Sequence, residues 1–265
     1  MTLKTRVFFR MLPILSNIWS LEIKSRRFKK MPDYYKVEER NHFLQKHSAK
    51  ILKHLNIELD IKGVENVPNS PCLIIPNHST YLDPFFLWSA LWNHGDGNKR
   101  SRIVNFLARK ETKNKRSVKL ISYLGDTYFI DTQKPREALE TLTAFGQFVK
   151  RNKSCGVIYP EGTRTRDGKL GNFNTGAFRV AQSTFLPIVP VTINNAANSL
   201  DWKRKGKLVV EIIFHNQLKP VQFHTLDPKA LTERVKEIIQ KDYKEQVITS
   251  KETLKNNYTK RENKN

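Results

Sequence analysis

CLIIPNHSTYLDP, residues 72–84, joins an apolar run to a polar loop and then to the start of another apolar segment. A run of this length and composition is typical of a buried strand. His78 follows the run directly, and in an α/β fold the loop past a strand end is where ligand crevices lie. Asp83 and Pro84 also have a second interpretation, because an aspartate before a proline commonly starts a helix, with the carboxylate as its cap. On this stretch alone, His78 is either a functional residue or an ordinary loop histidine.

Strand-like and helical segments alternate on both sides of this stretch. Apolar runs typical of strands occur at 59–61, 72–76, 103–107, 128–130, 155–159, 188–193 and 208–214. Helical segments are predicted at 34–55, 84–92, 135–150, 175–184 and 227–247, the last starting at Asp227 and Pro228. This alternation favours an α/β fold with a mostly parallel sheet flanked by helices. We expect an N-terminal helical, membrane-associating region at 1–56, an α/β domain at 57–250 and a disordered polar tail at 251–265.

The composition of the chain narrows the possible partners. Its 265 residues are 38% hydrophobic, with 47 Lys and Arg against 25 Asp and Glu, a formal net charge of +22. No run of 18 apolar residues occurs, which excludes a polytopic membrane protein, and residues 11–21 are too short and too polar for a secretory signal. The charge predicts attraction to a polyanion, either nucleic acid or an anionic lipid leaflet. No nucleic-acid-binding module is recognisable, so we expect the lipid surface.

The first 30 residues combine aromatic and aliphatic side chains with eight basic ones and only one acidic one, Glu22. This composition is typical of an amphipathic helix, or helix pair, lying in the headgroup plane of a membrane. The alternative is an ordinary amphipathic helix packed on the core. A second basic cluster would add to the attraction, and its members are Lys99, Arg100, Arg102, Arg109, Lys110, Lys113, Lys115, Arg116 and Lys119. These features predict a peripheral or monotopic protein on the cytoplasmic face of an anionic membrane.

The two cysteines, Cys72 and Cys155, each open an apolar run. Neither fits the spacing of a metal site or of a disulfide framework. We expect both to be reduced residues of the core, which favours a cytosolic compartment.

A second polar loop follows another apolar run. Residues 159–165 read YPEGTRT. Glu161 can accept hydrogen bonds from hydroxyl groups, Gly162 lets the backbone approach a ligand closely, and Arg164 offers a bidentate fork for a phosphate. The alternative is a polar turn in which Gly162 supplies an unusual dihedral angle and Arg164 is solvated.

Taken together, the two loops resemble motifs of the glycerol-phosphate acyltransferase superfamily, most closely its bacterial 1-acyl-sn-glycerol-3-phosphate acyltransferases. Residues 77–83 match its N-H-x-x-x-x-D motif and residues 161–164 its E-G-T-R motif. Residues 125–131, 173–178 and 187–191, with the pair Lys110 and Glu111, resemble further motifs of the family in the same order, across about residues 60–195. Two positions depart from the family: Thr132 stands where arginine is usual, and Asn174 where lysine is frequent. Each removes a positive charge expected near the substrates.

The resemblance implies an enzyme that moves a fatty acyl group from a thioester, either acyl-CoA or acyl-carrier protein, to the sn-2 hydroxyl of lysophosphatidate. It implies that His78 is the general base and Asp83 holds the imidazole. It also implies that Glu161, Gly162, Thr163 and Arg164 bind the glycerol phosphate, with Lys110 a weaker candidate. No cofactor or metal is expected. Oxyanion donors are expected among the backbone N–H groups near 78–80 or 162–163.

Several alternatives stay open. The same site would serve another lysophospholipid, glycerol 3-phosphate or a transacylation that does not use CoA. Ser79 and Thr80 lie close enough to His78 for an acyl-enzyme route, although direct attack needs neither. A basic nucleic-acid-binding protein is disfavoured, because no nucleic-acid module is recognisable. A catalytically inactive lipid-binding relative is also disfavoured, because the motif residues are intact: His78, Asp83, Glu161 and Arg164.

Overall fold

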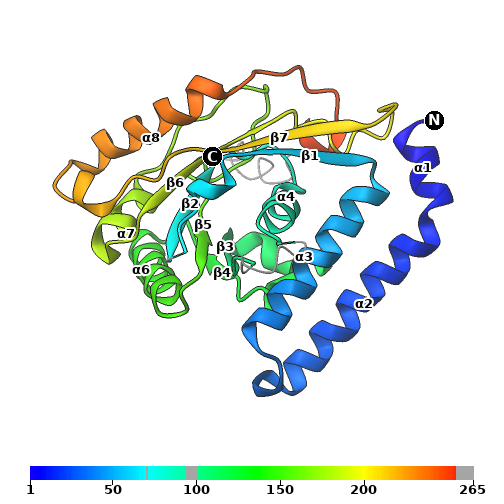
Figure 1. The fold of residues 1–265 in the computed structure, drawn as a ribbon, viewed down its shortest axis with the longest axis horizontal. Coiled ribbons are helices and arrows are strands. Elements are labelled where there is room, and N and C mark those ends of the chain that lie inside the picture. Colours follow the sequence, from blue (N-terminus) through cyan, green and yellow to red (C-terminus); the bar gives the residue numbers. More distant parts are fainter. Residues whose placement is uncertain (70, 94–100, 255–265) are drawn as a thin grey trace.

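A seven-stranded sheet forms the centre of the molecule (Figure 1). The computed structural model describes residues 1–69, 71–93 and 101–254. The strands are β1 (Ile57–Lys62), β2 (Cys72–Pro76), β3 (Val104–Arg109), β4 (Tyr128–Ile130), β5 (Cys155–Val157), β6 (Ile188–Asn194) and β7 (Leu208–Phe214). Their order across the sheet is β1-β7-β6-β2-β5-β3-β4. All pairs are parallel except β6 with β7, which confirms the mostly parallel sheet.

Helices cover both faces of the sheet (Figure 1). The helices are α1 (Leu3–Phe9), α2 (Met11–Lys30), α3 (Val37–His54), α4 (Asp83–Ala90), α5 (Arg116–Leu124), α6 (Pro135–Arg151), α7 (Gly176–Thr184), α8 (Pro228–Asp242) and α9 (Lys251–Leu254). Helices α3 and α4 pack on one face, and α6, α7 and α8 pack on the other. The flanking helices are therefore as predicted.

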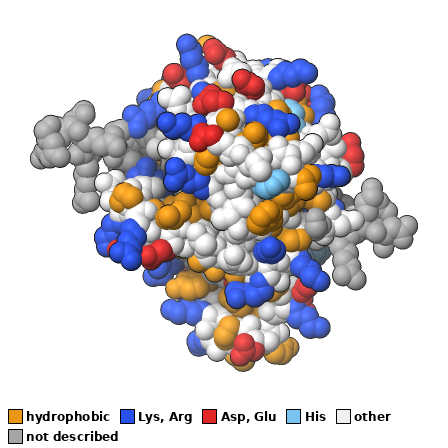
Figure 2. All heavy atoms as spheres, turned by 90° about the vertical axis from the view of Figure 1, so that its left-hand side faces the viewer, with side chains coloured by type: hydrophobic (Ala, Val, Ile, Leu, Met, Phe, Trp, Pro, Cys, Tyr) orange, Lys and Arg blue, Asp and Glu red, His pale blue; other side chains and the backbone are white. Residues whose placement is uncertain are grey.

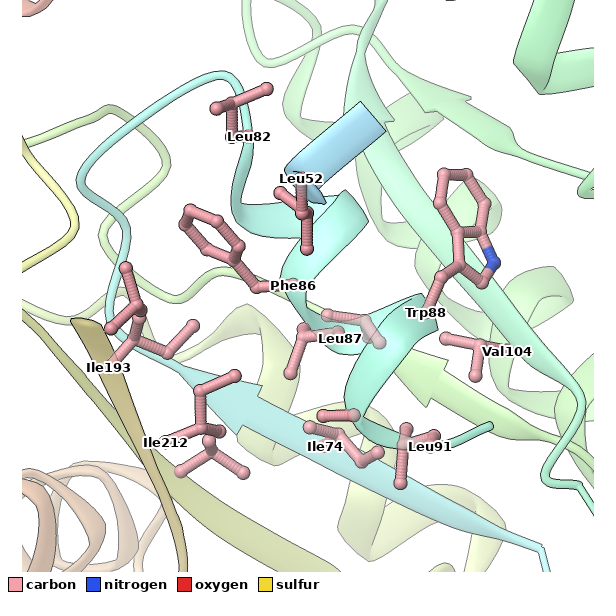
Figure 3. Close-up of a cluster of buried hydrophobic side chains, with 14 of the residues drawn as sticks. Leu52, Ile74, Leu82, Phe86, Leu87, Trp88, Leu91, Val104, Ile193 and Ile212 are labelled. Atoms are coloured by element: carbon pink, nitrogen blue, oxygen red, sulfur yellow. The ribbon is translucent and has the colours of Figure 1, made fainter. Parts of the chain in front are cut away.

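Strand β2 shows how the sequence produces this layering. Cys72 and Ile74 belong to the core cluster beneath α3 and α4, whereas Leu73 and Ile75 belong to the cluster beneath α6, α7 and α8. Successive side chains of a strand point to opposite faces, so a strand covered on both sides is apolar throughout. Figure 3 shows Ile74 beneath Leu87 of α4, in the same buried cluster as Ile193 of β6 and Ile212 of β7. Each fully buried aliphatic side chain stabilises the fold by roughly 1.5–3 kcal/mol.

The two cysteines face each other in this core. Cys72 and Cys155 are register partners on β2 and β5, and their sulfur atoms lie 3.6 Å apart. Both are buried free thiols, as predicted.

The N-terminal segment forms two helices joined at Arg10. Pro13 lies in the first turn of α2, where a missing N–H leaves no bond unmade. Asn17, Leu21 and Ser25 of α2 are buried, and the opposite face exposes a set of large apolar side chains: Met11, Leu12, Leu15, Ile18 and Trp19. In the described part of the chain, no helix is both long and apolar enough to cross a bilayer.

Several boundaries differ from the sequence-based expectation. Helix α8 starts as predicted, with the Asp227 side chain accepting from Lys229 N, but it ends at Asp242 instead of 247. Helix α5 was not predicted, because its basic residues obscure the apolar spacing. The tail predicted to be disordered starts with helix α9, and its remainder, residues 255–265, lies outside the described residues. Lys99 and Arg100 of the second basic cluster also lie outside them.

Candidate functional site

The site lies where two loops leave the carboxyl ends of neighbouring parallel strands. Strands β2 and β5 are paired, so the loop after Pro76 and the loop after Val157 emerge side by side. Two hydrogen bonds join the loops at one residue: Thr165 N donates to His78 O at 2.9 Å, and His78 N donates to a carboxylate oxygen of Glu161 at 2.7 Å. Asn77 anchors the first loop to β6, since its amide exchanges two hydrogen bonds with the backbone of Ile193. The residues of both sequence motifs therefore meet.

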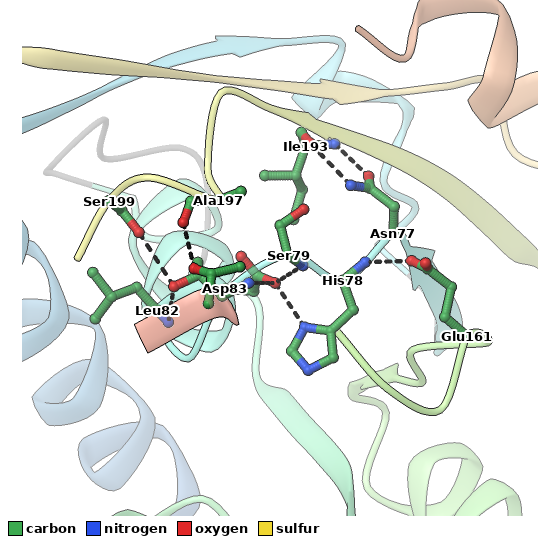
Figure 4. A network of polar contacts seen from close by, with 11 residues as sticks. Asn77, His78, Ser79, Leu82, Asp83, Glu161, Ile193, Ala197 and Ser199 are labelled. Carbon is green, nitrogen blue, oxygen red and sulfur yellow. Dashed lines mark hydrogen bonds and ion pairs between the residues drawn. The ribbon is translucent and has the colours of Figure 1, made fainter. Parts of the chain in front are cut away.

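His78 is held by a buried carboxylate (Figure 4). Its Nδ1 lies 2.7 Å from Oδ2 of Asp83, a side chain with no exposed surface. The same oxygen accepts from Ser79 N at 2.7 Å and Thr80 N at 3.0 Å. Because a carboxylate only accepts, Nδ1 is the donor, and whenever the ring is neutral the lone pair belongs to Nε2. Figure 4 shows this second ring nitrogen turned away from the network.

The interpretation of Asp83 as a helix cap is wrong. Leu82 occupies the cap position of α4, and Asp83 is the first residue of the helix. Its Oδ2 accepts from backbone groups that precede it, at residues 79 and 80, and not from the open N–H groups of the following turn. The carboxylate thus folds the His78 loop back on itself.

An aromatic stack supports the imidazole ring. The ring of Tyr159 lies parallel to that of His78, with centroids 4.1 Å apart, and Phe106 of β3 stacks beyond Tyr159. Burial, with a smaller effect of Asp83, raises the pKa of Tyr159 well above its usual value, so the phenol stays neutral. Sequence reasoning missed this support, because nothing in the sequence distinguishes a tyrosine that ends a strand from one that stacks on a distant histidine.

Glu161 links the His78 loop to a third segment. One oxygen accepts from His78 N, and the other accepts from Gly171 N at 2.9 Å. A Cβ on Gly171 would lie 2.6 Å from that second oxygen, so only glycine allows this approach. Burial raises the pKa of Glu161 to about 7, although the two backbone N–H groups favour its charged form. Both oxygens are therefore hydrogen-bonded within the protein.

Cationic side chains gather around Tyr81. The guanidinium carbon of Arg164 lies 3.6 Å from the centre of its ring, and Lys115 Nζ lies 2.7 Å from its hydroxyl oxygen. Arg164 is buried, which strengthens its field because little water screens it. The Lys110 Nζ pairs with Asp131 at 3.1 Å, and Lys110 does not line the pocket described below. Lys115, five positions later, borders it instead.

A pocket of about 540 Å³ opens beside His78. Its wall near His78 is polar and includes Tyr81, Lys115, Glu161, Gly162, Thr163 and Arg164. The remainder is mostly apolar and is built by α4, β3, α5 and α6, with Phe85, Trp88, Phe106, Ile121 and Leu142 among its lining residues. An apolar cavity with a few charged groups at one end suits an amphiphile.

The two departures from the family motifs border the same pocket. Thr132 and Asn174 both contribute to its lining. The Asn174 side chain donates to Pro160 O at 2.9 Å and thereby closes the loop that contains Glu161. Gly162 in that loop has a φ of 68°, a left-handed conformation that favours glycine.

The expected oxyanion donors are mostly engaged elsewhere. The N–H groups of residues 78, 79 and 80 all donate to the carboxylates of Glu161 or Asp83. Gly162 N donates to Tyr159 O. Thr163 N makes no hydrogen bond to any residue that the structure describes. The described chain also contains no group of three or more His, Cys, Asp or Glu side chains placed to hold a metal ion.

Comparisons with known proteins show which family the chain resembles. Residues 58–194 match the family model described as Acyltransferase. The chain is 27% identical to a probable 1-acyl-sn-glycerol-3-phosphate acyltransferase of Mycoplasma genitalium, over 83% of this chain and 84% of that protein. It is 32% identical to the 1-acyl-sn-glycerol-3-phosphate acyltransferase of Saccharomyces cerevisiae, over 71% of this chain and 61% of that protein.

A solved structure shares the fold. The 1-acyl-sn-glycerophosphate acyltransferase PlsC of Thermotoga maritima superposes with a TM-score of 0.65 at 21% identity, over 90% of this chain and 92% of that one. At this identity the likeness concerns the fold alone. The match to the family model covers both loops and the strands that carry them, so this chain belongs to the acyltransferase family.

Proposed function

We propose that this protein transfers a fatty acyl group from an acyl thioester to the sn-2 hydroxyl of lysophosphatidate, which yields phosphatidate. The names of its relatives support the reaction and the acceptor. The observation that carries the proposal is the contact between His78 and Asp83 at the polar end of an apolar pocket. A base, a cationic end and an apolar cavity are what an acyl transfer to a phosphorylated lipid requires.

The proposed chemistry follows from the hydrogen bonds of His78. Asp83 holds the proton on Nδ1, so the Nε2 lone pair takes the proton of the acceptor hydroxyl as its oxygen attacks the thioester carbonyl carbon. The Asp83 carboxylate stabilises the imidazolium that forms. When the tetrahedral intermediate collapses, the carbon–sulfur bond breaks and the imidazolium returns its proton to the departing thiolate. General base catalysis of this kind typically contributes about 10²- to 10⁴-fold to the rate.

The rest of the pocket supplies binding and charge stabilisation. Arg164 and Lys115, which both contact Tyr81, suit the phosphate of the acceptor, because guanidinium and ammonium groups form charge-assisted hydrogen bonds with it. Thr163 N–H is the proposed oxyanion donor, since the neighbouring N–H groups already have acceptors. The apolar wall of α4, α5 and α6 receives an acyl chain.

Direct attack is favoured over an acyl-enzyme. Ser79 and Thr80 are the hydroxyl side chains nearest to His78 in sequence, and each is only 1% exposed. Thr80 Oγ1 also accepts from Ser199 Oγ at 3.2 Å. A nucleophile so enclosed does not meet a thioester without a rearrangement of the loop.

The proposed place of action is the cytoplasmic face of a membrane. Helices α1 and α2 expose large apolar side chains next to basic ones, the composition of an interfacial element. Elsewhere on the surface, Figure 2 shows lysine and arginine side chains scattered among acidic, apolar and other groups on the face formed by α6, α7 and α8. The proposed donor is acyl-CoA or acyl-carrier protein.

Acyl transfer by the purified protein tests the proposal. Lysophosphatidate, other lysophospholipids and glycerol 3-phosphate are each offered with both kinds of donor, and we expect lysophosphatidate to react fastest. Arg164→Ala should raise the KM for lysophosphatidate about ten- to hundredfold. Lys110→Ala is the matched control and should change it little, because Lys110 lies outside the pocket. Absence of transfer to lysophosphatidate from either donor would overturn the proposal.

A further inference from the structure

The loop between β6 and β7, residues 195–207, reaches the N-terminal end of α1 (Figure 1). Leu3 N donates to Arg204 O at 2.7 Å, and Lys4 N donates to Trp202 O at 3.1 Å. Thr2 also forms an antiparallel bridge with Lys205. The loop and the first turn of α1 therefore form one continuous surface, although they lie far apart in the chain.

This surface combines an exposed aromatic ring with lysines. Trp202 of the loop is 43% exposed, and in the last turn of α1, beyond this surface, Phe8 and Phe9 are 69% and 72% exposed. Lys4, Lys203 and Lys205 are exposed as well, and none of them forms an ion pair with a described residue. The nearby acidic groups have partners within the protein, since Glu58 pairs with Lys207 and the Asp201 carboxylate accepts from Lys203 N and Thr249 Oγ1. The lysine charges are thus left for an external anion.

The loop is held rigidly behind this surface. Arg204 turns inward, and its guanidinium donates to Leu55 O at 2.7 Å and to Gly206 O at 3.0 Å. Asn198, at the other end of the loop, binds the C-terminal segment through Val247 O and Thr249 N. A fixed loop that presents an indole ring has little conformational entropy to lose on binding, in contrast to a flexible one.

We propose that the loop carrying Trp202 is a second membrane anchor, which inserts its indole ring into the headgroup layer of an anionic bilayer beside α1. This inference rests on the proposed membrane-surface function and extends it beyond the first 30 residues. A tryptophan with its polar N–H suits the interface, where one end of the ring is apolar and the other is wet. The lysines supply charge complementarity to anionic lipid, each strengthening binding by up to about fivefold.

Vesicle binding tests the anchor directly. Full-length protein is sedimented with vesicles of phosphatidylcholine containing phosphatidylglycerol, and with vesicles of phosphatidylcholine alone. We expect Trp202→Ala to weaken binding to the anionic vesicles about tenfold. The double variant Lys203→Gln and Lys205→Gln should also weaken it about tenfold, with a smaller effect on neutral vesicles. Phe185→Ala is the matched control, since Phe185 is 60% exposed at the end of α7, far from α1 in Figure 1.

Three outcomes separate the anchor from the function on which it rests. Normal vesicle binding by both loop variants, or equal losses in the Phe185 control, would overturn the anchor and leave the membrane-surface proposal intact. Failure of the unaltered protein to bind any vesicle would overturn both. A change in oligomeric state without lipid, measured by analytical ultracentrifugation of Trp202→Ala, would show that a second copy of the chain covers the surface and would also overturn the anchor.

The activity of the same variant is a further control. Transfer to a short-chain, water-soluble acceptor should be unchanged by Trp202→Ala.

Discussion

Two histidines of this protein make the same kind of contact and differ in what they can do. His78 in the strand-end loops directs Nδ1 at the Asp83 carboxylate, and His47 in α3 directs Nδ1 at the side-chain oxygen of Asn17 in α2. The His78 side chain keeps 20% of its surface exposed and borders the pocket, whereas His47 is buried between helices. Burial, with smaller effects of Lys50 and Lys46, lowers the pKa of His47 to about 4. His78 thus has a carboxylate partner and access to the pocket, whereas burial keeps His47 neutral, and this difference underlies the proposed role of His78.

The largest effect on kcat is expected when the carboxylate that accepts from His78 is replaced by an amide, the kind of acceptor that His47 has. Asp83→Asn should lower kcat by about 10³-fold, because an amide does not stabilise an imidazolium and can hold the wrong tautomer. The change also removes a charged acceptor from Ser79 N and Thr80 N, so some stability should be lost. Steady-state kinetics and thermal unfolding, measured on the same preparation, check both effects. A folded variant with normal turnover would show that the carboxylate has no part in the chemistry.

The reverse exchange sharpens the same contrast. Asn17→Asp gives His47 a carboxylate acceptor, which should raise its pKa from about 4, since an opposite charge favours the imidazolium. Titration of the His47 ring by NMR measures this shift. We expect no effect on acyl transfer. If the pKa of His47 stayed near 4 beside a carboxylate, burial alone would control it, and the acceptor would not explain the difference between the two histidines.

A smaller effect is expected from Glu161, which positions His78 through its backbone. Glu161→Gln replaces one accepting oxygen by an NH₂ group that faces an N–H donor, and an unsatisfied buried donor costs about 1–3 kcal/mol. We expect about a tenfold loss of kcat with little change in acceptor KM. Gly171→Ala is an independent probe, because its methyl group would displace the same carboxylate without changing its charge. A loss confined to acceptor KM in both variants would instead support the hydroxyl-binding role that the family motif implies.

The sequence predicted the positions of the strands better than the contacts of individual side chains. Every residue of β2 is buried, as its uninterrupted apolar run predicts, because such a run flanked by helical segments indicates a parallel strand covered on both faces. The role of Asp83 was ambiguous in the sequence, because an aspartate before a proline is typical of a helix start and is equally able to be the partner of a histidine. Only the three-dimensional position of Oδ2, against residues 78 to 80, separates the two.

Other features depend on irregular backbone that no sequence period describes. Gly171 lies in a segment without regular structure, so its contact with Glu161 could not be foreseen. Lys110 begins a short 3₁₀ helix, Lys110–Asn114, and Lys115 follows it directly. The geometry of this helix places Lys115, and not Lys110, at the pocket. Asn17 is a polar residue in an apolar stretch, and only the packing of α2 on α3 shows that it meets His47.

The smallest effect concerns stability and its dependence on pH. Because folding lowers the pKa of His47 from 6.5 to about 4, the unfolded chain binds a proton more readily between these values. The stability from neutral His47 is therefore complete above pH 6.5 and is lost as the pH falls towards 4. Denaturant unfolding of the unaltered protein and of His47→Gln should show a difference in free energy that shrinks by about 2 kcal/mol over this range. Other titrating groups, Glu161 included, are common to both proteins. A constant difference between them would contradict the pKa assigned to His47.

The turnover number of His78→Ala, measured with saturating lysophosphatidate and acyl donor, tests the central claim most directly. Removal of the imidazole leaves the pocket, Arg164 and the apolar wall in place, so substrate binding should persist while proton transfer is lost. We expect kcat to fall by about 10²- to 10⁴-fold, with circular dichroism and thermal unfolding close to those of the unaltered protein. His47→Ala, assayed in parallel, should keep its kcat. Near-normal turnover by a folded His78→Ala protein would contradict the assignment of His78 as the general base.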